Sequence, residues 1–237
     1  MFTPEGKVRP HYEEFNVFLS KVSNKKMNQL QFSANKAQKA MGMTFNVYHD
    51  NQGLEKILHL DIIPRIIPNS EWRKLEAGLK QRIFALNLFL QDIYNEQKIL
   101  KDGIIPSDLI LGSKDYLKPC IGLTPPKGIW CHITGTDLVK DKDGEYYILE
   151  DNLRCPSGVS YMLENREAML RLFPGLCSDH RLAPVGHYPE ELLETLKEAA
   201  PPNCKGAPRV AILTPGHFNS AYYEHCFLAD EMGVEVV

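Results

Sequence analysis

The segment GTDLVKDKDGEYYILEDNLRCPSG, residues 135–158, carries most of the information about fold and function. Asp143-Gly144 is a strong hairpin signal, because a two-residue turn needs positive φ angles that Asp and Gly tolerate. With these two residues as the loop, Asp137 lies directly opposite Glu150, with Cβ atoms about 5 Å apart. Asn152 lies two residues beyond Glu150 and therefore points to the same face. The register predicts two carboxylates and an amide on one face of a hairpin.

Like charges that face each other destabilise a sheet unless something lies between them. The same register predicts Val139 and Ile148 as apolar neighbours on that face, where unpaired carboxylates would be costly. A magnesium ion removes the conflict, because carboxylate and amide oxygens are suitable ligands for it. The alternative is a solvated hairpin whose carboxylates are neutralised by Lys140 or Arg154. Both interpretations stay open on register alone.

The residues after the hairpin favour an anion site. Arg154 has a planar guanidinium that could neutralise a phosphate. The following turn, Cys155-Pro156-Ser157-Gly158, has backbone amides that could cradle an anion. A surface ion pair for Arg154 and an ordinary turn for the next four residues are the alternatives.

The rest of the chain predicts a mixture of helices and strands. Helical periodicity covers residues 12–40, and a second amphipathic stretch runs from Glu71 until Gly103 ends it. A further helix is predicted over 162–172. Strands are predicted over the ranges 43–50, 108–111, 128–139 and 145–150.

The C-terminal region predicts a strand–helix–strand unit. Residues 198–208 have the composition of a linker. Beyond them, RVAILTPG reads as a buried strand, NSAYYEHCFLADEMG as a helix and VEVV as a second, parallel strand. We therefore expect a first portion over residues 1–200 and the beginning of an α/β domain over 207–237. Since no stop signal follows the last strand, we expect a truncated chain.

Composition limits the classes of partner. The chain has 237 residues and a net charge of -3, which makes no general electrostatic case for nucleic acid or an anionic membrane. No apolar run approaches the roughly 20 residues that cross a bilayer, and the first residues have no apolar signal core. We expect a cytoplasmic protein whose six scattered cysteines are reduced thiols.

The metal-ligand pattern resembles that of a known superfamily. A Glu-x-Asn pair that closes a hairpin, with an Asp thirteen residues before the Glu, is similar to the metal-binding signature of ATP-grasp enzymes. The wider pattern resembles circularly permuted ATP-grasp proteins related to glutathionylspermidine synthase. The matching segments extend over nearly the whole chain: VRPHY (8–12), IPRII (63–67), EW (71–72), GLKQRIFALNLFLQDIYN (78–95), DGIIP (102–106), HITGTDLV (132–139), LEDNLRCPSGVSYMLENR (149–166) and TPGHFNSAYYEH (214–225).

This resemblance implies an α/β (α+β) fold with an ATP-grasp-like mixed sheet and a metal-binding hairpin. It also implies an ATP- and Mg2+-dependent ligase that joins a small carboxylate to an amine through an acyl phosphate. Asp137, Glu150 and Asn152 would hold the metal, and Arg154 would act beside the transferred phosphoryl group. The other residues with implied roles are Ser157 and Gly158, at the nucleotide phosphates.

Two further arginines are candidate anion binders. Arg65 and Arg82 each lie among apolar neighbours, where an unpaired Arg would be costly; structural ion pairs are the alternative for both. His132 is expected in the core, with substrate contact as its alternative.

Two departures from the family pattern matter. Many ATP-grasp enzymes have an Arg two positions before the first metal Asp, where this chain has Gly135. Another cation, Arg65 or Arg154, would then have to neutralise the transition state, or the chemistry is weakened. The permuted order also places the lysine-bearing lobe that clamps the nucleotide after Val237, so this chain is expected to bind ATP poorly on its own. The competing interpretation is a non-catalytic binding or scaffold module, and transfer to a thiol or phosphate transfer to a carboxylate remains a third.

Overall fold

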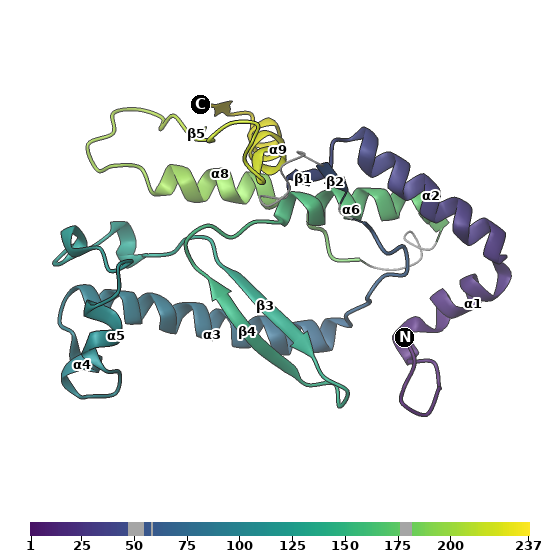
Figure 1. Cartoon of the computed structure of the whole chain (residues 1–237), viewed down its shortest axis with the longest axis horizontal. Coiled ribbons are helices and arrows are strands. Elements are labelled where there is room, and N and C mark those ends of the chain that lie inside the picture. Colours follow the sequence, from purple (N-terminus) through teal and green to yellow (C-terminus); the bar gives the residue numbers. More distant parts are fainter. Residues whose placement is uncertain (47–54, 58, 176–181) are drawn as a thin grey trace. The chain divides into compact units, whose positions relative to one another are not determined.

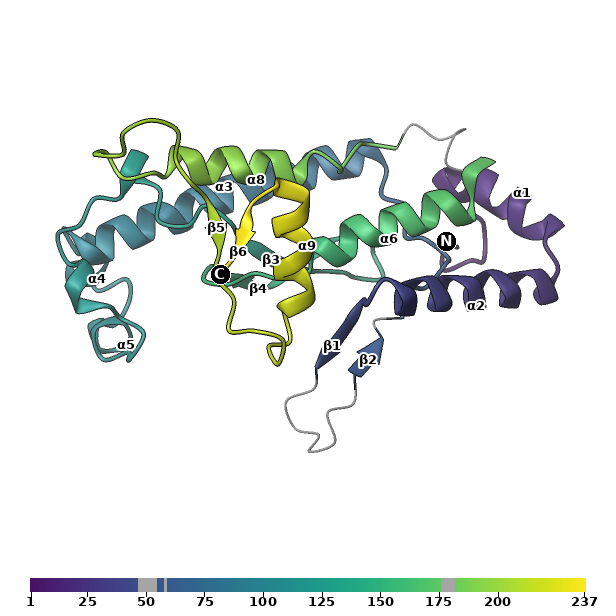
Figure 2. The same cartoon turned by 90° about the horizontal axis from the view of Figure 1, so that it is seen from above.

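The computed structural model of the protein describes residues 1–46, 55–57, 59–175 and 182–237. Its contacts divide the chain into two compact units: Met1–Ile67 with Ser157–Val237, and Pro68–Pro156. Figures 1 and 2 show the elements of each unit. The expected division into 1–200 and 207–237 concerns folding domains and stays a prediction.

The second unit consists of a long helix, a set of short turns and a hairpin. Its elements are α3 (Asn69–Tyr94), α4 (Lys98–Lys101), α5 (Ser107–Leu111), η2 (Lys118–Cys120), η3 (Pro126–Gly128), β3 (Gly135–Lys140) and β4 (Tyr146–Asn152). The hairpin β3–β4 runs beside α3 in Figure 1, and several ion pairs join the two. Helix α3 is therefore the support on which the hairpin rests.

The prediction of one helix from Glu71 to Gly103 is confirmed only as far as Tyr94. Gln97 adopts a left-handed conformation with a φ of 55°, which interrupts the helix. The Asp92 carboxylate accepts hydrogen bonds from the next amides, Lys98 at 3.0 Å and Ile99 at 2.9 Å, and so starts α4. A polar side chain competing for backbone amides is the reason for the break.

An aromatic stack fixes the chain that leads into the hairpin. The Tyr94 ring lies 4.9 Å from those of both Tyr116 and Trp130, nearly parallel to each. The Asn87 side chain on α3 accepts hydrogen bonds from the amides of Trp130 (2.8 Å) and Cys131 (3.0 Å). The entrance to β3 is thus attached to α3 through both packing and hydrogen bonds.

Two of the predicted strands differ from the structure. The prediction of a strand over 108–111 is wrong, because Ser107–Leu111 forms the short helix α5. Pro106 directly before it and Asp108 in its first turn are helix-start signals that outweigh a short apolar run. The strand predicted over 128–139 begins only at Gly135, whereas that predicted over 145–150 is confirmed as β4.

The first unit begins with two helices. The predicted helical region 12–40 is confirmed as α1 (Glu13–Lys21), preceded by η1 (Pro10–Tyr12), and α2 (Asn24–Ala40). Ser23 separates them, because its hydroxyl accepts the Lys26 amide at 3.2 Å and caps α2. Strand β1 (Thr44–Asn46) pairs antiparallel with β2 (Glu55–Ile57), and the remainder of the strand predicted over 43–50 lies outside the described residues.

The core of this unit lies between α2 and α6 (Val159–Leu172), the helix predicted over 162–172. Ala34, Ile62 and Phe173 are buried at its centre. Gln38, which has no exposed surface, donates a hydrogen bond to Asn165 of α6 at 3.1 Å. This buried polar pair joins segments that are far apart in the sequence.

The predicted strand–helix–strand unit is confirmed. After α8 (Tyr188–Glu198) come β5 (Ala211–Ile212), α9 (Tyr222–Met232) and β6 (Glu235–Val236), and β5 and β6 are parallel. A single mixed sheet is not formed by the described residues, whose strands make three separate pairs. None of the helices in these ranges has the length and apolarity needed to cross a bilayer. The described cysteines are free thiols, and Cys177 lies outside the described residues.

Candidate functional site

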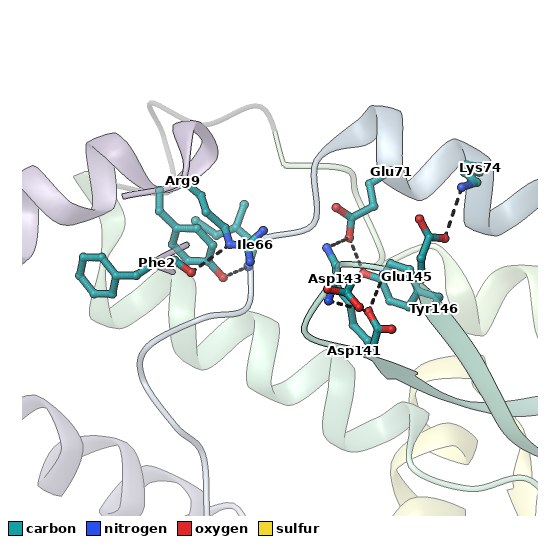
Figure 3. Close-up of polar contacts among 11 residues, drawn as sticks. Phe2, Arg9, Ile66, Glu71, Lys74, Asp141, Asp143, Glu145 and Tyr146 are labelled. Atoms are coloured by element: carbon teal, nitrogen blue, oxygen red, sulfur yellow. Dashed lines mark hydrogen bonds and ion pairs between the residues drawn. The ribbon is translucent and has the colours of Figure 1, made fainter. Parts of the chain in front are cut away.

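The hairpin turn contains three residues rather than the predicted two. The Asp141 amide donates to the Glu145 carbonyl at 2.9 Å, which leaves residues 142–144 as the loop. The Asp141 side chain accepts the amides of Asp143 and Glu145, both at 2.9 Å (Figure 3). Gly144 supplies the one positive φ, 91°. Asp141 organises the turn through its carboxylate, and a search for Asp-Gly alone misses this role.

The predicted pairing of Asp137 with Glu150 is confirmed, although the prediction reached it through a wrong turn. Near the turn, Leu138 pairs with Ile148 and Val139 with Tyr147, one residue away from the predicted register. A β-bulge between the Asp137 and Leu138 pairs leaves Leu149 as an extra residue and shifts the register back. The longer turn shifts the register by one residue and the bulge shifts it back by one, so the predicted partner of Asp137 is correct. The neighbours predicted for the carboxylates are therefore wrong at Ile148, which lies on the other face.

The three predicted metal ligands lie on one exposed face of the hairpin. The Asn152 amide donates to the Glu150 carboxylate at 3.3 Å, which places both side chains together. Asp137, Glu150 and Asn152 are all exposed, and the apolar neighbours on this face are exposed as well. Water therefore screens the carboxylates more than buried apolar neighbours would allow. Across the described ranges no three His, Cys, Asp or Glu side chains converge on a common point; the candidate set has two carboxylates and one amide.

The opposite face of the hairpin is attached to α3 by charged groups. Arg82 donates to the Asp151 carboxylate from two nitrogens, at 2.7 and 2.6 Å, and the Thr136 hydroxyl donates to the same carboxylate at 3.0 Å. The hydrogen bonds from Arg82 lower the pKa of Asp151 below its usual value. The Asp151 side chain is only 9% exposed. Of the two roles open for Arg82, the structure displays the ion pair.

A second polar cluster joins the hairpin to the start of α3 (Figure 3). The Glu71 carboxylate accepts from Lys140 at 2.6 Å and from the Tyr146 hydroxyl at 2.5 Å. Lys74 forms an ion pair with Glu145 at 3.7 Å. Between the two clusters, α3 and the hairpin line an open pocket of about 590 Å³, whose mostly apolar surface includes Leu75 and Ile148. These contacts orient the hairpin so that the face with Asp137 and Glu150 points away from α3.

Gly135, the departure from the family pattern, has a packing explanation. A Cβ at this position would lie 2.9 Å from the Pro156 Cβ and 3.6 Å from the Asn152 Cβ. Contacts below 3.0 Å require the neighbour to move, so an Arg here would displace Pro156. The start of β3 and the turn after β4 approach each other closely, and glycine permits this.

The residues predicted to bind anions are distributed over both units. Arg154 is exposed at the end of the second unit, whereas Arg65 and Ser157 are exposed residues of the first. The Gly158 amide already has an anionic partner, because it donates to both oxygens of the Glu224 carboxylate at 2.8 Å. His132 is exposed, so the expectation that it belongs to the core is wrong.

Sequence reasoning missed the role of Glu224. The residue lies in the apolar helical run AYYEHCFLA, and a carboxylate in such a run signals a buried partner. Its partners are 64 and 66 residues earlier in the chain. Local sequence patterns do not reveal a hydrogen bond between residues this far apart in the chain.

The chain matches the family model described as circularly permuted ATP-grasp type 2 over residues 64–237. An uncharacterized protein of Synechocystis is 52% identical over the entire chain, which covers 49% of that relative. One from Mycobacterium tuberculosis is 41% identical over the entire chain and 42% of its own length. A Frankia alni protein with a provisional name as a glutamate–cysteine ligase is 36% identical over 98% of the chain and 27% of the relative.

The chain thus spans about half the length of the first two relatives. The family match covers α3, the carboxylate hairpin and the strand–helix–strand unit together. The chain belongs to the circularly permuted ATP-grasp family.

Proposed function

We propose that the protein acts as an ATP- and Mg2+-dependent ligase that joins a carboxylate to an amine. The observation that supports this most directly is the pairing of Asp137 with Glu150, with Asn152 beside them on an exposed hairpin face. A hairpin designed only for stability would not place like charges directly opposite each other. Membership of the ATP-grasp family explains the carboxylate pair in this proposal, because such a pair could bind the metal ion that accompanies ATP.

The donor set suits magnesium. Asp137 and Glu150 supply carboxylate oxygens and Asn152 an amide oxygen, which are hard ligands appropriate to this ion. Because the face is exposed, room remains for water and for substrate phosphates, which magnesium usually retains as ligands. When bound, the ion would neutralise charge on the ATP phosphates.

The proposed reaction has two steps. A carboxylate oxygen of the substrate attacks the γ-phosphorus of ATP, the bond to the β-phosphate oxygen breaks, and ADP leaves. The amine then attacks the carbonyl carbon of the acyl phosphate, inorganic phosphate leaves, and the nitrogen loses a proton. The protein's part is to position the reactants and stabilise their charge.

Arg154 and Ser157 are the proposed contacts of the transferred phosphoryl group, because both are exposed and follow the metal-ligand strand. Arg65 is a further proposed source of positive charge, which Gly135 does not supply. Arg82 would serve the nucleotide only by leaving Asp151, so its main role is to hold the hairpin. Gly158 would act through its conformation, since its amide is bonded to Glu224.

The substrates are proposed by class. Names of two Frankia relatives refer to glutamate–cysteine ligation, which joins an amino-acid carboxylate to an amino-acid amine. We therefore infer that small amino acids or peptides are the first substrates to test. A reaction that consumes ATP on such metabolites fits the cytoplasm.

The test is ADP release by the natural full-length protein with magnesium, ATP and a panel of carboxylates and amines. ADP formation that needs both substrates, and that Glu150→Gln abolishes without unfolding, is the expected result. Asp143→Asn, at the exposed tip of the same hairpin, is the matched control and should retain turnover. A folded protein that binds nucleotide but releases no ADP above the Glu150→Gln background would point to a non-catalytic module instead. Product analysis separates an amide from a thioester or an acyl phosphate.

A further inference from the structure

Glu224 on α9 is a buried carboxylate, with 5% of its surface exposed. Both of its oxygens accept the Gly158 amide at 2.8 Å. Its Oε2 also accepts from the Ser160 amide at 3.0 Å and the Ser160 hydroxyl at 2.7 Å. Ser160 has no exposed surface and Gly158 is partly buried, so most of this network is shielded from water.

The network satisfies two requirements at once. The first amides of a helix have no partners within it, and Gly158, which precedes α6, has no side chain to cap them. A carboxylate is also favoured at this end of a helix by the helix dipole. A buried charge would in turn be costly without such hydrogen bonds. Glu224 caps α6 from a distant part of the chain.

This cap determines the conformation of the segment before α6. Gly158 has a φ of 105°, a region that only glycine adopts readily. Because Glu224 holds its amide, the peptide that joins Ser157 to Gly158 has one orientation. The backbone that carries the exposed Ser157 is therefore held in place from α9.

We propose that Glu224 is a positioning residue for the Ser157–Gly158 segment, an inference that rests on the proposed nucleotide-binding role of Ser157. The carboxylate fixes the Gly158 peptide and, through it, the Ser157 side chain that meets the phosphates. The strand–helix–strand unit thereby contributes to the nucleotide site through α9 without touching the ligand.

The test uses Glu224→Gln in the natural full-length protein. This change keeps the size of the side chain but replaces one accepting oxygen by an NH2 group that would face the backbone donors. Glu231→Gln, an exposed residue of the same helix, is the matched control. Two quantities are measured: hydrogen exchange of the Gly158 and Ser160 amides, and the affinity and stoichiometry of Mg·ADP binding by calorimetry.

We expect both amides to exchange at least about tenfold faster in Glu224→Gln, because a charge-assisted hydrogen bond is lost. The dissociation constant for Mg·ADP should rise about tenfold with unchanged stoichiometry, the effect of one such bond. A merely structural role would instead lower the stoichiometry, since misfolded molecules do not bind. Glu224→Asp should recover part of the affinity, and Glu231→Gln should match the wild type.

Faster exchange with unchanged Mg·ADP affinity would overturn the positioning role and leave the proposed function intact. Absence of Mg·ADP binding by the wild type would overturn both. If Glu224→Gln does not fold, Ser160→Ala provides the same test, because it removes only the hydroxyl donor. It should weaken Mg·ADP binding about threefold, in proportion to a neutral hydrogen bond, and an unchanged affinity would count against the proposal.

Discussion

Replacing Asp137 by Asn should stabilise the protein in the absence of magnesium, because Asp137 faces the Glu150 carboxylate across the hairpin. Side chains directly opposite each other have Cβ atoms about 5 Å apart. In water, two unit charges at about 5 Å repel by about 0.8 kcal/mol. The high dielectric is appropriate since both residues are exposed. For a chain of this size the relief corresponds to a rise in melting temperature of about 2–3 °C at low ionic strength.

The assay is thermal unfolding at 10 mM and 500 mM salt, with and without magnesium. Salt should reduce the difference between Asp137→Asn and the wild type, because exposed charges are screened. Magnesium should raise the melting temperature of the wild type more than that of the variant, since the wild type has one more ligand for it. Asp143→Asn removes the same charge from the same hairpin and corrects for net charge. A melting temperature of Asp137→Asn at or below that of the wild type, without magnesium and at low salt, would refute the reasoning.

Three other predictions concern the hairpin and the helix that supports it. Arg82→Gln should be less stable than the wild type at neutral pH, because Arg82 lowers the pKa of Asp151. The extra stability of the wild type should be present above about pH 4, the ordinary pKa of Asp, and should vanish as the pH falls through the lowered pKa of Asp151. Urea unfolding between pH 3 and 7 measures the difference in stability. A difference that does not change with pH would contradict the prediction. Gly144→Ala should destabilise by about 1–2 kcal/mol, because Gly144 has a φ of 91°. Gly78→Ala should instead stabilise the protein by about 1 kcal/mol, since Gly78 lies inside α3 and an added Cβ has no atom within 4 Å. Urea unfolding measures the change in stability for both glycine variants. If both variants change the stability in the same direction, glycine conformation is not the cause.

Much of the site could be predicted from sequence because it is local. Asp137 and Glu150 belong to one hairpin, so the alternation of side chains and the position of the turn are enough to predict that they pair. The turn and the bulge escaped prediction because each depends on a detail that alternation does not contain, the Asp141 side chain in one case and an extra Leu149 in the other. The pairing of Glu224 with Gly158 depends on tertiary contact, which no local pattern specifies. Helix α5 was missed because a short apolar run fits a strand and a helix equally well.

The first unit is made of two separate stretches of chain, Met1–Ile67 and Ser157–Val237, and this has a consequence for synthesis. Gln38 and its hydrogen-bond partner Asn165 are 127 residues apart. At translation rates of about 5–20 residues per second, Gln38 waits about 6–25 s on the ribosome before Asn165 is made. Residues Pro68–Pro156, which contact mainly one another, emerge during this interval and can fold first. Helix α2 meanwhile has only part of its buried surface covered, because the residues of α6 that pack against it have not yet been made.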